Sequence, residues 1–537
     1  MRAEQIEKLE KPLVFQWSCL STIETAKGAF RVKKIVRRKL AGEKRRIARR
    51  LANAVRVNTG GPMLSSAGIE YEIGDRTRAI AHGGIGVIQR VVKRSGLARK
   101  IDAKLGLLKI HKPYHESDHV LNIAYNAVFG GQRLEDIELR RNDRVLLDAL
   151  GTASLPDPTT AGDFCRRFDG QSLDVLMEAI NEARLEVWRT QPKEFFGETA
   201  RIDADASIVP TTGDCKQGME ISYNGIWGYS VLMVSLANTG EVLYLVNHGA
   251  NRPSHEGVVP RFDQSIEMCR RAGFRDILLR GDTDFSITTE FDRWDDQGVR
   301  FVFGYDARAN LVERAQNAPD RQYHELVRRA ERVIQTQART KPEDVKDRIV
   351  RARRFQTIRT KGEDVCEFEY RPVQCQRPFR VVALRKNLSI EKGDDVLFDD
   401  IRYFFFITND WSMSADEVVH EGRARCNQEN LISQLKGGVR ALHAPVNTLH
   451  ANWAYMVMTS LAWNLKAWTA LLLPVHRRWA DAHKAQRQRL LTMEFRTFVA
   501  ALIHIPAQIV RTARTIRYRL LAWNAWQSAL FRLACAL

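Results

Sequence analysis

The sequence predicts an α/β fold with a mixed β-sheet core, a β-rich insertion within that core, and helical regions on both sides of it. Three observations support this prediction. The hydrophobic period is helical over residues 85–188, changes at Thr199 to the alternation typical of strands, and becomes helical again after Ser414. Strands that first follow one another in hairpin order and then alternate with helices indicate a mixed sheet in an α/β layer fold.

Two predicted segments precede the core. Residues 1–62 are expected to form a basic extension, because a dense run of Lys and Arg at 26–56 has apolar residues at roughly helical intervals. Residues 63–198 are expected to be helical. Their helices are interrupted at Leu155-Pro-Asp-Pro158, where proline ends one helix and Thr or Asp can cap the next.

Residues 199–306 are predicted to form the first part of the core. Two of their β-rich segments are joined by Asn238-Thr-Gly240, which is typical of a hairpin, and the later segments alternate with helical stretches. The β-rich segments are residues 200–210, 229–237, 241–246, 276–282 and 299–305.

The second half of the chain is predicted in three parts. Residues 307–409 do not continue the alternation of strands and helices seen in the core. They contain a charged helical portion followed by short β-rich stretches, and are expected to form an inserted β-rich subdomain. Residues 410–475 are expected to complete the core, starting with a helix after Ser414. Residues 476–537 are expected to form a basic helical C-terminal region, because their arginines fall on mostly polar helix faces.

The charge balance indicates a polyanionic partner. The chain of 537 residues carries 83 Lys and Arg against 64 Asp and Glu, a formal charge of +19. This balance is expected of a nucleic-acid binder and favours DNA or RNA over an anionic membrane surface. The basic run at 26–56 is then either an arm that binds DNA or a solvated extension. If translation can also start at Met63, this run is dispensable. The helical region 63–198 either binds DNA ends or packs against the core.

Cysteine usage and the apolar stretches predict a cytoplasmic protein without a membrane span. The 8 cysteines are scattered, without a C-x-x-C motif or a nearby pair of histidines, so we expect neither a zinc site nor a disulfide framework. No apolar segment follows Met1, so no secretory signal is expected. The most apolar stretch, residues 453–473, is interrupted by Asn464 and Lys466, and we interpret it as a buried core helix.

Two aspartates stand where a metal site would need them. Asp205 lies in the first predicted strand of the sheet, and Asp282 follows an apolar strand across Gly281, at the carboxyl end where α/β sites gather. Asp203 lies two residues before Asp205 and faces the same side of the strand, so periodicity does not choose between them. Taken alone, an Asp near a strand end is more often a turn or cap residue.

The helix after Ser414 adds a third carboxylate and two cations. At about 100° per residue, Arg425, Glu429 and Lys436 project from one face of a helix. Glu429 can supply a hard oxygen ligand to a divalent metal, Arg425 can grip a phosphate bidentately, and Lys436 adds a point charge. An exposed helix with an ordinary ion pair would explain these residues if they stood alone.

In this order, the motifs resemble those of the DDE transposases of bacterial insertion sequences, and most closely the group-1 DDE transposase domain. Ile202-Asp-Ala-Asp205-Ala-Ser207 is similar to the first motif of this family, and Leu279-Arg-Gly-Asp282-Thr-Asp-Phe285 is similar to the second. Arg425, Glu429 and Lys436 match the R-E-K pattern of the third motif.

The resemblance implies an RNase H-like catalytic core with an insertion between its last strand and the glutamate helix. It implies that Asp205, Asp282 and Glu429 are catalytic and bind Mg²⁺, with Mn²⁺ as a possible substitute, and that Arg425 and Lys436 hold DNA phosphates. The implied reaction is hydrolysis at the element's ends by metal-activated water, followed by attack of the freed 3′-hydroxyl on target DNA. The implied partners are the terminal inverted repeats and target DNA, bound by a homodimer of a bacterial, nucleoid-associated protein.

The sequence departs from the family pattern at Gly422, where the third motif usually has tyrosine, and at Asp284, where glycine is usual. Asp205 is preferred to Asp203 as the first ligand because Ala-Ser follows it, as in the family motif. The missing tyrosine keeps a second function open, a catalytically inactive protein that binds the DNA ends as a decayed or regulatory transposase. A third is an RNase H-like nuclease that cuts without joining.

Overall fold

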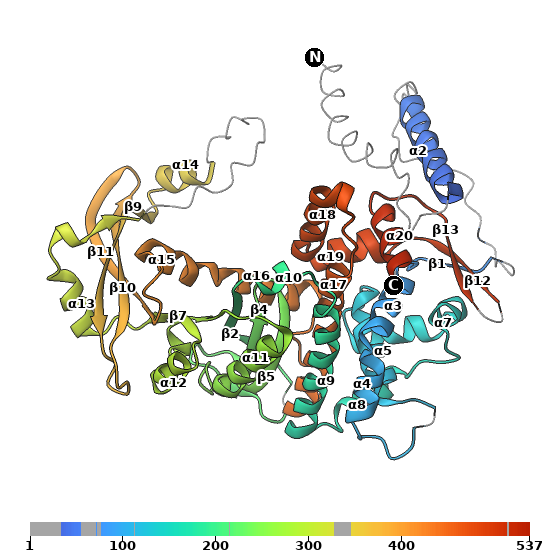
Figure 1. The fold of residues 1–537 in the computed structure, drawn as a ribbon, viewed down its shortest axis with the longest axis horizontal. Coiled ribbons are helices and arrows are strands. Elements are labelled where there is room, and N and C mark those ends of the chain that lie inside the picture. Colours follow the sequence, from blue (N-terminus) through green and yellow to red (C-terminus); the bar gives the residue numbers. More distant parts are fainter. Residues whose placement is uncertain are drawn as a thin grey trace. The chain divides into compact units, whose positions relative to one another are not determined.

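The chain forms two compact units, which we describe separately (Figure 1). The sheet unit is Pro192–Ser433, and the helical unit combines Met1–Gln191 with Gln434–Leu537. The computed structural model describes residues 34–54, 71, 77–111, 113–213, 215–326, 345–512 and 515–537. Of the basic extension predicted for residues 1–62, only the helix α2 (Lys34–Ala54) lies within these ranges.

A mixed sheet of ten strands forms the centre of the sheet unit, and this confirms the predicted α/β class. The strands are β2 (Ala200–Pro210), β3 (Glu220–Ile221), β4 (Trp227–Leu236), β5 (Glu241–Gly249), β6 (Ile277–Gly281), β7 (Arg300–Tyr305), β8 (His324–Glu325), β9 (Gln356–Tyr370), β10 (Phe379–Lys392) and β11 (Asp395–Thr408). Their order is β3-β4-β2-β6-β7-β11-β10-β9-β8, and β5 pairs with β4. β2 is antiparallel to β4 and parallel to β6, which is parallel to β7.

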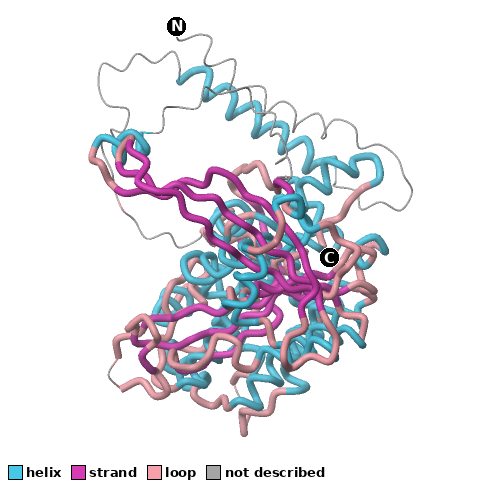
Figure 2. Tube along the Cα trace, turned by 90° about the vertical axis from the view of Figure 1, so that its left-hand side faces the viewer, coloured by secondary structure: helices cyan, strands magenta, loops and turns pink. Residues whose placement is uncertain are grey.

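The strands of the segment expected to form an inserted β-rich subdomain continue the sheet of the core. β11 pairs antiparallel with β7, from Phe405 opposite Tyr305 to Thr408 opposite Val302, and β10 pairs with both β9 and β11. Figure 2 shows these long strands as a magenta ribbon. Val365 on β9 belongs to the same buried cluster as Val302 on β7, so the insertion and the core share part of one hydrophobic interior.

Short helices surround this sheet, and α15 covers the part where the core meets the insertion. The helices are α10 (Lys193–Phe196), α11 (Val258–Ala272), α12 (Phe291–Asp296), α13 (Ala309–Gln316), α14 (Val345–Ala352), α15 (Ala415–Ala424) and α16 (Cys426–Ser433). Ser414 caps α15 in a reciprocal capping box with Glu417, as the sequence around it predicts. Val418 and Val419 then face the cluster that contains Val302 and Val365.

The helical unit is built around one buried helix. Its helices are α3 (Ile85–Ser95), α4 (Leu97–Lys104), α5 (Glu116–Val128), α6 (Glu138–Arg141), α7 (Arg144–Leu150), α8 (Pro158–Cys165), α9 (Gly170–Trp188), α17 (Leu449–Leu471), α18 (Ala480–Thr492), α19 (Phe495–Phe498) and α20 (Gln527–Ala536). α17 packs against α3, α5, α8, α9 and α18, and its residues from Ala451 to Leu471 are buried. It therefore confirms the predicted core helix, although the sequence assigned it to the α/β core. Among the described helices, none is long and apolar enough to span a membrane.

The prediction that residues 476–537 are helical throughout is wrong. β12 (Ala507–Arg511) and β13 (Ile516–Leu520) pair antiparallel, and β1 (Ala79–Ile80) adds a third strand to this small sheet. Pro506 ends the preceding helical segment, and buried Ala507 and Ile509 alternate with more exposed neighbours, which is the period of a strand. Several of the C-terminal arginines therefore lie on strands.

Candidate active site

Parallel pairing of β2 with β6 brings Asp205 and Asp282 to the same place. The last paired residues of these strands are Asp203 and Arg280. Asp205 and Asp282 each lie two positions farther along, and in a parallel pair such residues face the same side of the sheet at the carboxyl end of β6. The two aspartates predicted from strand position are thus neighbours in the fold.

The turn that carries Asp282 depends on a glycine of the adjacent strand. The Asp282 carboxylate accepts a hydrogen bond from the backbone N–H of Asp284 at 3.1 Å. A Cβ atom at Gly304 on β7 would lie 3.0 Å from the backbone nitrogen of Thr283 and 3.2 Å from the carbonyl carbon of Asp282. Only glycine allows β7 to approach this turn so closely. Asp284 itself is exposed beside the site.

Arg425 lies between the two aspartates, at the junction of α15 and α16. Its Nη1 atom is 3.8 Å from Oδ2 of Asp205, and its Nη2 atom is 3.9 Å from Oδ2 of Asp282. These distances exceed those of hydrogen bonds, so the guanidinium balances both charges without being bound tightly to either. Its side chain is 22% exposed, so it remains accessible to an anion.

Gln428, the residue before Glu429, holds α16 against the sheet. The side-chain amide of Gln428 donates to the backbone carbonyls of Asp203 at 3.3 Å and of Met233 at 3.0 Å, and so ties α16 to β2 and β4. Glu429, one residue farther along α16, is exposed. Its negative charge acts on Asp205, so Glu429 lies on the same side of the site as that aspartate's neighbours in charge, Asp282 and Arg425. Sequence reasoning did not identify Gln428.

Asp205 experiences the negative charges of both Asp282 and Glu429. Burial is the main cause that raises the pKa of Asp205 to about 6, and the charges of Asp282 and Glu429 raise it further, while Arg425 opposes them. Burial also raises the pKa of Asp282, and Asp284 adds to this effect. Two neighbouring, partly buried aspartates with raised pKa values form a site where a cation would be stabilised.

Replacing Asp205 by Asn should stabilise the folded protein at neutral pH in the absence of divalent metal. The folded pKa of about 6 exceeds the ordinary value of 3.8, so the folded state binds more protons between these values. The contribution of Asp205 to the free energy of unfolding is therefore largest below about pH 4, and it is lost as the pH rises through about 6. The expected gain of the Asn variant is about 2–3 kcal/mol at about pH 7.5 and near zero at about pH 4. Urea unfolding in chelator would measure it, and an Asn variant less stable than wild type at neutral pH would contradict it.

Asp203, the alternative to Asp205, is held in a buried ion-pair network. Both of its carboxylate oxygens accept hydrogen bonds from Arg280, at 2.7 and 2.9 Å, and its residue is only 1% exposed. Arg280 also donates to Glu421 at 2.8 Å, and Glu421 accepts from Arg201 at 3.0 and 3.1 Å. Because its oxygens are already bound, Asp203 is less suited than Asp205 to be a ligand.

The position where the family usually has tyrosine is closely packed. Gly422 lies in α15, and a Cβ atom there would come within 2.5 Å of Cδ1 and Cε1 of Phe406 on β11. Phe406 therefore fills the space that a side chain at residue 422 would need. In this chain Gly422 stands at the tyrosine position of the motif, and Phe406 packs directly against it.

Lys436 does not continue the helix of Glu429 in the predicted way. α15 ends at Ala424, α16 ends at Ser433, and a π-helical turn, η6 (Gln434–Gly438), follows. Within it, the N–H of Val439 donates to the carbonyl of Gln434 at 2.8 Å, five residues back. A π-turn changes the angular spacing of side chains, so the prediction of one regular α-helix with three residues on one face is wrong. Lys436 belongs to the helical unit, and its phosphate-binding role stays a prediction.

Comparison with known proteins identifies a family and several similar solved structures. The family model described as transposase DDE domain group 1 matches residues 74–537. A solved structure of a piggyBac transposase synaptic complex with hairpin DNA is similar at 10% sequence identity, over 78% of this chain and 81% of that chain, with a TM-score of 0.35. No curated protein matches the chain.

Proposed function

Because the chain belongs to the transposase DDE domain group 1 family, we propose that it cleaves DNA at the ends of an insertion sequence and joins the freed ends to target DNA. The observation that supports this proposal is that Arg425 lies 3.8 and 3.9 Å from the carboxylates of Asp205 and Asp282, while the charge of Glu429 acts on Asp205. The formal charge of +19 supports a DNA partner. Pairing of two ends would require at least two copies of the chain.

The strand order supports an RNase H-like core. The order β5-β4-β2-β6-β7 has antiparallel pairs on one side of β2 and parallel pairs on the other. β2 carries Asp205 near the middle of this arrangement, and β6 leads directly to Asp282. β8–β11 follow β7 and precede α15, as expected for an insertion ahead of the glutamate helix.

The donor set fits divalent metal ions. Asp205, Asp282 and Glu429 offer carboxylate oxygens, the ligands that Mg²⁺ prefers, and Mn²⁺ accepts the same donors. When bound, two such ions would activate the attacking oxygen and stabilise the leaving one. Arg425 would then be released from the aspartates and could hold a phosphate of the DNA bidentately.

Arg425→Ala should weaken end cleavage more than it weakens DNA binding. The expected loss of cleavage is about 10²-fold, because one charge-assisted contact near the reacting phosphate is removed. Nonspecific binding at low salt should stay nearly unchanged, since many other cations contribute to it. Arg425→Lys is the matched control and should recover part of the activity, because it keeps the charge but not the bidentate geometry. An equal loss in binding and cleavage would contradict this role.

The test of the function uses the gene's own flanking DNA as substrate. Purified protein with Mg²⁺ should cut at inverted repeats on either side of the gene and transfer the 3′ ends into a second DNA molecule. Cleavage without strand transfer would favour a nuclease. Tight binding to the repeats without cleavage in Mg²⁺ or Mn²⁺ would favour the inactive end-binding protein, which the glycine at residue 422 first suggested.

A further inference from the structure

A second group of potential metal ligands lies in the helical unit, at the junction between the loop after α4 and the start of α5. It consists of His111, His115 and Glu116, and one ligand atom from each lies within 4.8 Å of the others. The cysteine pattern predicted no zinc site, and this group escaped that reasoning because it contains no cysteine.

Glu116 is the most informative member because its carboxylate is buried and only one of its two oxygens accepts hydrogen bonds. The residue is 0% exposed, and its Oε1 atom accepts hydrogen bonds from the backbone N–H groups of Leu107 at 3.1 Å and Leu108 at 3.0 Å. Within the described ranges, Oε2 has no hydrogen-bond donor, although Nδ1 of His111 lies 3.2 Å away. An ionised oxygen buried without a donor is costly, and a cation at this point would remove the cost.

The two histidines are arranged so that one ion can reach both. The rings of His111 and His115 are stacked, with centroids 5.2 Å apart and planes that differ by 12°, so rotation of one side chain would direct both ring nitrogens to one ion. Zinc–nitrogen bonds of about 2.0–2.1 Å would place two imidazole centroids on one ion about 5 Å apart. Both histidines are exposed, so an ion can enter from solvent. Imidazole nitrogens with one carboxylate suit Zn²⁺, whereas Mg²⁺ prefers oxygen ligands alone.

We propose that His111, His115 and Glu116 bind one Zn²⁺ ion, with solvent completing the coordination, and that this ion fastens the loop between α4 and α5 to the first turn of α5. The loop already makes hydrogen bonds there through Glu116, and His115 donates its backbone N–H to Asp118 at 2.9 Å. The ion would add a coordinate link between the loop residue His111 and the start of α5, where Nδ1 of His111 already lies 3.2 Å from Oε2 of Glu116.

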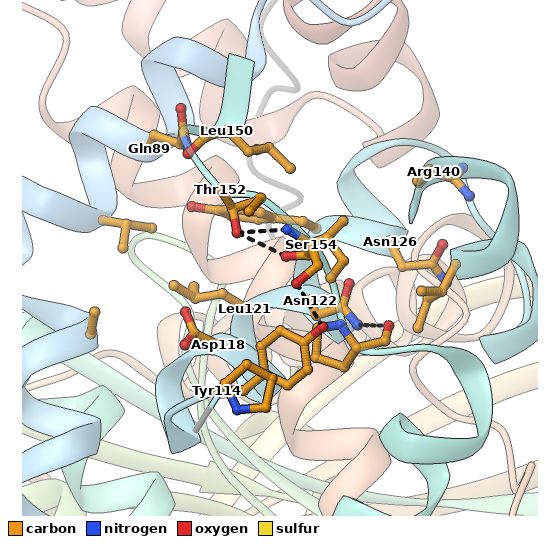
Figure 3. A pocket seen from close by; sticks show the side chains of 18 of the residues that line it. Gln89, Tyr114, Asp118, Leu121, Asn122, Asn126, Arg140, Leu150, Thr152 and Ser154 are labelled. Carbon is orange, nitrogen blue, oxygen red and sulfur yellow. Dashed lines mark hydrogen bonds between the residues drawn. The ribbon is translucent and has the colours of Figure 1, made fainter. Parts of the chain in front are cut away.

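The fastened loop forms part of a cavity of about 830 Å³ in the helical unit (Figure 3). Pro113 and Tyr114, between the two histidines, line this cavity, and the Tyr114 hydroxyl donates to Oγ of Ser154 at 3.0 Å. None of the five residues predicted for the active site lines it. Zinc would therefore hold one wall of this cavity in place, independently of the proposed transposase reaction.

Zinc titration of the chelator-treated full chain tests the proposal. Wild type should bind one tight zinc equivalent in excess Mg²⁺ and unfold at a higher temperature with zinc than without it. Cobalt substitution should give the absorption bands of a nitrogen-ligated site. His111→Ala and His115→Ala should lose the tight equivalent and the thermal shift. His255→Ala, which removes an exposed histidine of the sheet unit, should keep both.

Two further variants make the outcome decisive. Asp282→Asn should retain the zinc equivalent, which separates this site from the carboxylates of the proposed active site. Glu116→Gln should lose it while its side-chain oxygen can still accept from the loop. Wild type that binds no zinc beyond the level of the His115→Ala variant would overturn the proposal. The same stoichiometry in His111→Ala, His115→Ala and wild type would overturn it as well.

Discussion

Asp282→Asn and Glu429→Gln should each lower DNA end cleavage in Mg²⁺ by about a thousandfold. Both changes keep the size of the side chain and remove a negative charge that would hold the metal. The charge stabilisation that metal ions supply in such reactions is worth several kcal/mol, and each loss of about 1.4 kcal/mol is a factor of ten in rate. Cleavage of a DNA fragment that carries the inverted repeat measures the effect.

The matched control for this loss is Asp284→Asn. Asp284 is an exposed acid two residues from Asp282, and it contributes its backbone N–H to the Asp282 carboxylate, which the substitution leaves in place. This variant should cleave within about threefold of wild type, in line with the small effect of an exposed charge. Wild-type cleavage by Asp282→Asn or Glu429→Gln would remove these residues from the proposed site. DNA binding should be retained in all three variants, because the basic surface is unchanged.

Arg280→Met should destabilise the sheet unit by about 3–5 kcal/mol, because it leaves Asp203 and Glu421 buried without their shared cation. Arg280 is 2% exposed and donates to both carboxylates, so water cannot replace it. The measurement is urea unfolding of the full chain at neutral pH. A combined Asp203→Asn substitution should recover part of the loss, since it removes the unpaired charge of Asp203, whereas Glu421 keeps its hydrogen bonds from Arg201.

Arg293→Met serves as the control for a surface ion pair. Arg293 pairs with Asp263 at 3.0 Å, but both side chains are more than a third exposed, at 37% and 38%. Its replacement should cost no more than about 1 kcal/mol. If Arg280→Met and Arg293→Met unfold at the same urea concentration, the buried network does not stabilise the sheet.

Much of the candidate site could be predicted because its parts depend on local pattern. Alternation placed Asp205 on a strand, a run of apolar residues placed Asp282 at a strand end, and the capping sequence at Ser414 located the start of α15. The resemblance to DDE transposases that these motifs carried is confirmed by the family match. The sequence could not decide between Asp203 and Asp205 as the first ligand. That choice depends on Arg280, which binds the Asp203 carboxylate, and no local sequence pattern reveals the partners of a charged residue within an apolar strand.

The features that escaped prediction arise from distant contacts. The π-helical turn after Glu429 is held from far along the chain, where the side chain of Gln434 accepts a hydrogen bond from the N–H of Phe495 at 3.0 Å. The pairing of β11 with β7 joins segments about a hundred residues apart, so the sequence indicated an inserted β-rich subdomain but not that its strands continue the core sheet. β12 and β13 had a strand period and a preceding Pro506, but their arginines resembled the polar face of a helix.

The pairing of β11 with β7 also bears on how such a protein can be engineered or can evolve. An insertion tethered only at its two ends could be removed as a cassette. Here, removal of residues 307–409 would strip β7 of its partner along Val302–Tyr305 and leave unpaired amide and carbonyl groups at an apolar edge. Exposed edges of this kind recruit other chains. A shortened version of this protein would therefore need a replacement strand, or a charged or proline-bearing cover, to avoid aggregation through this edge.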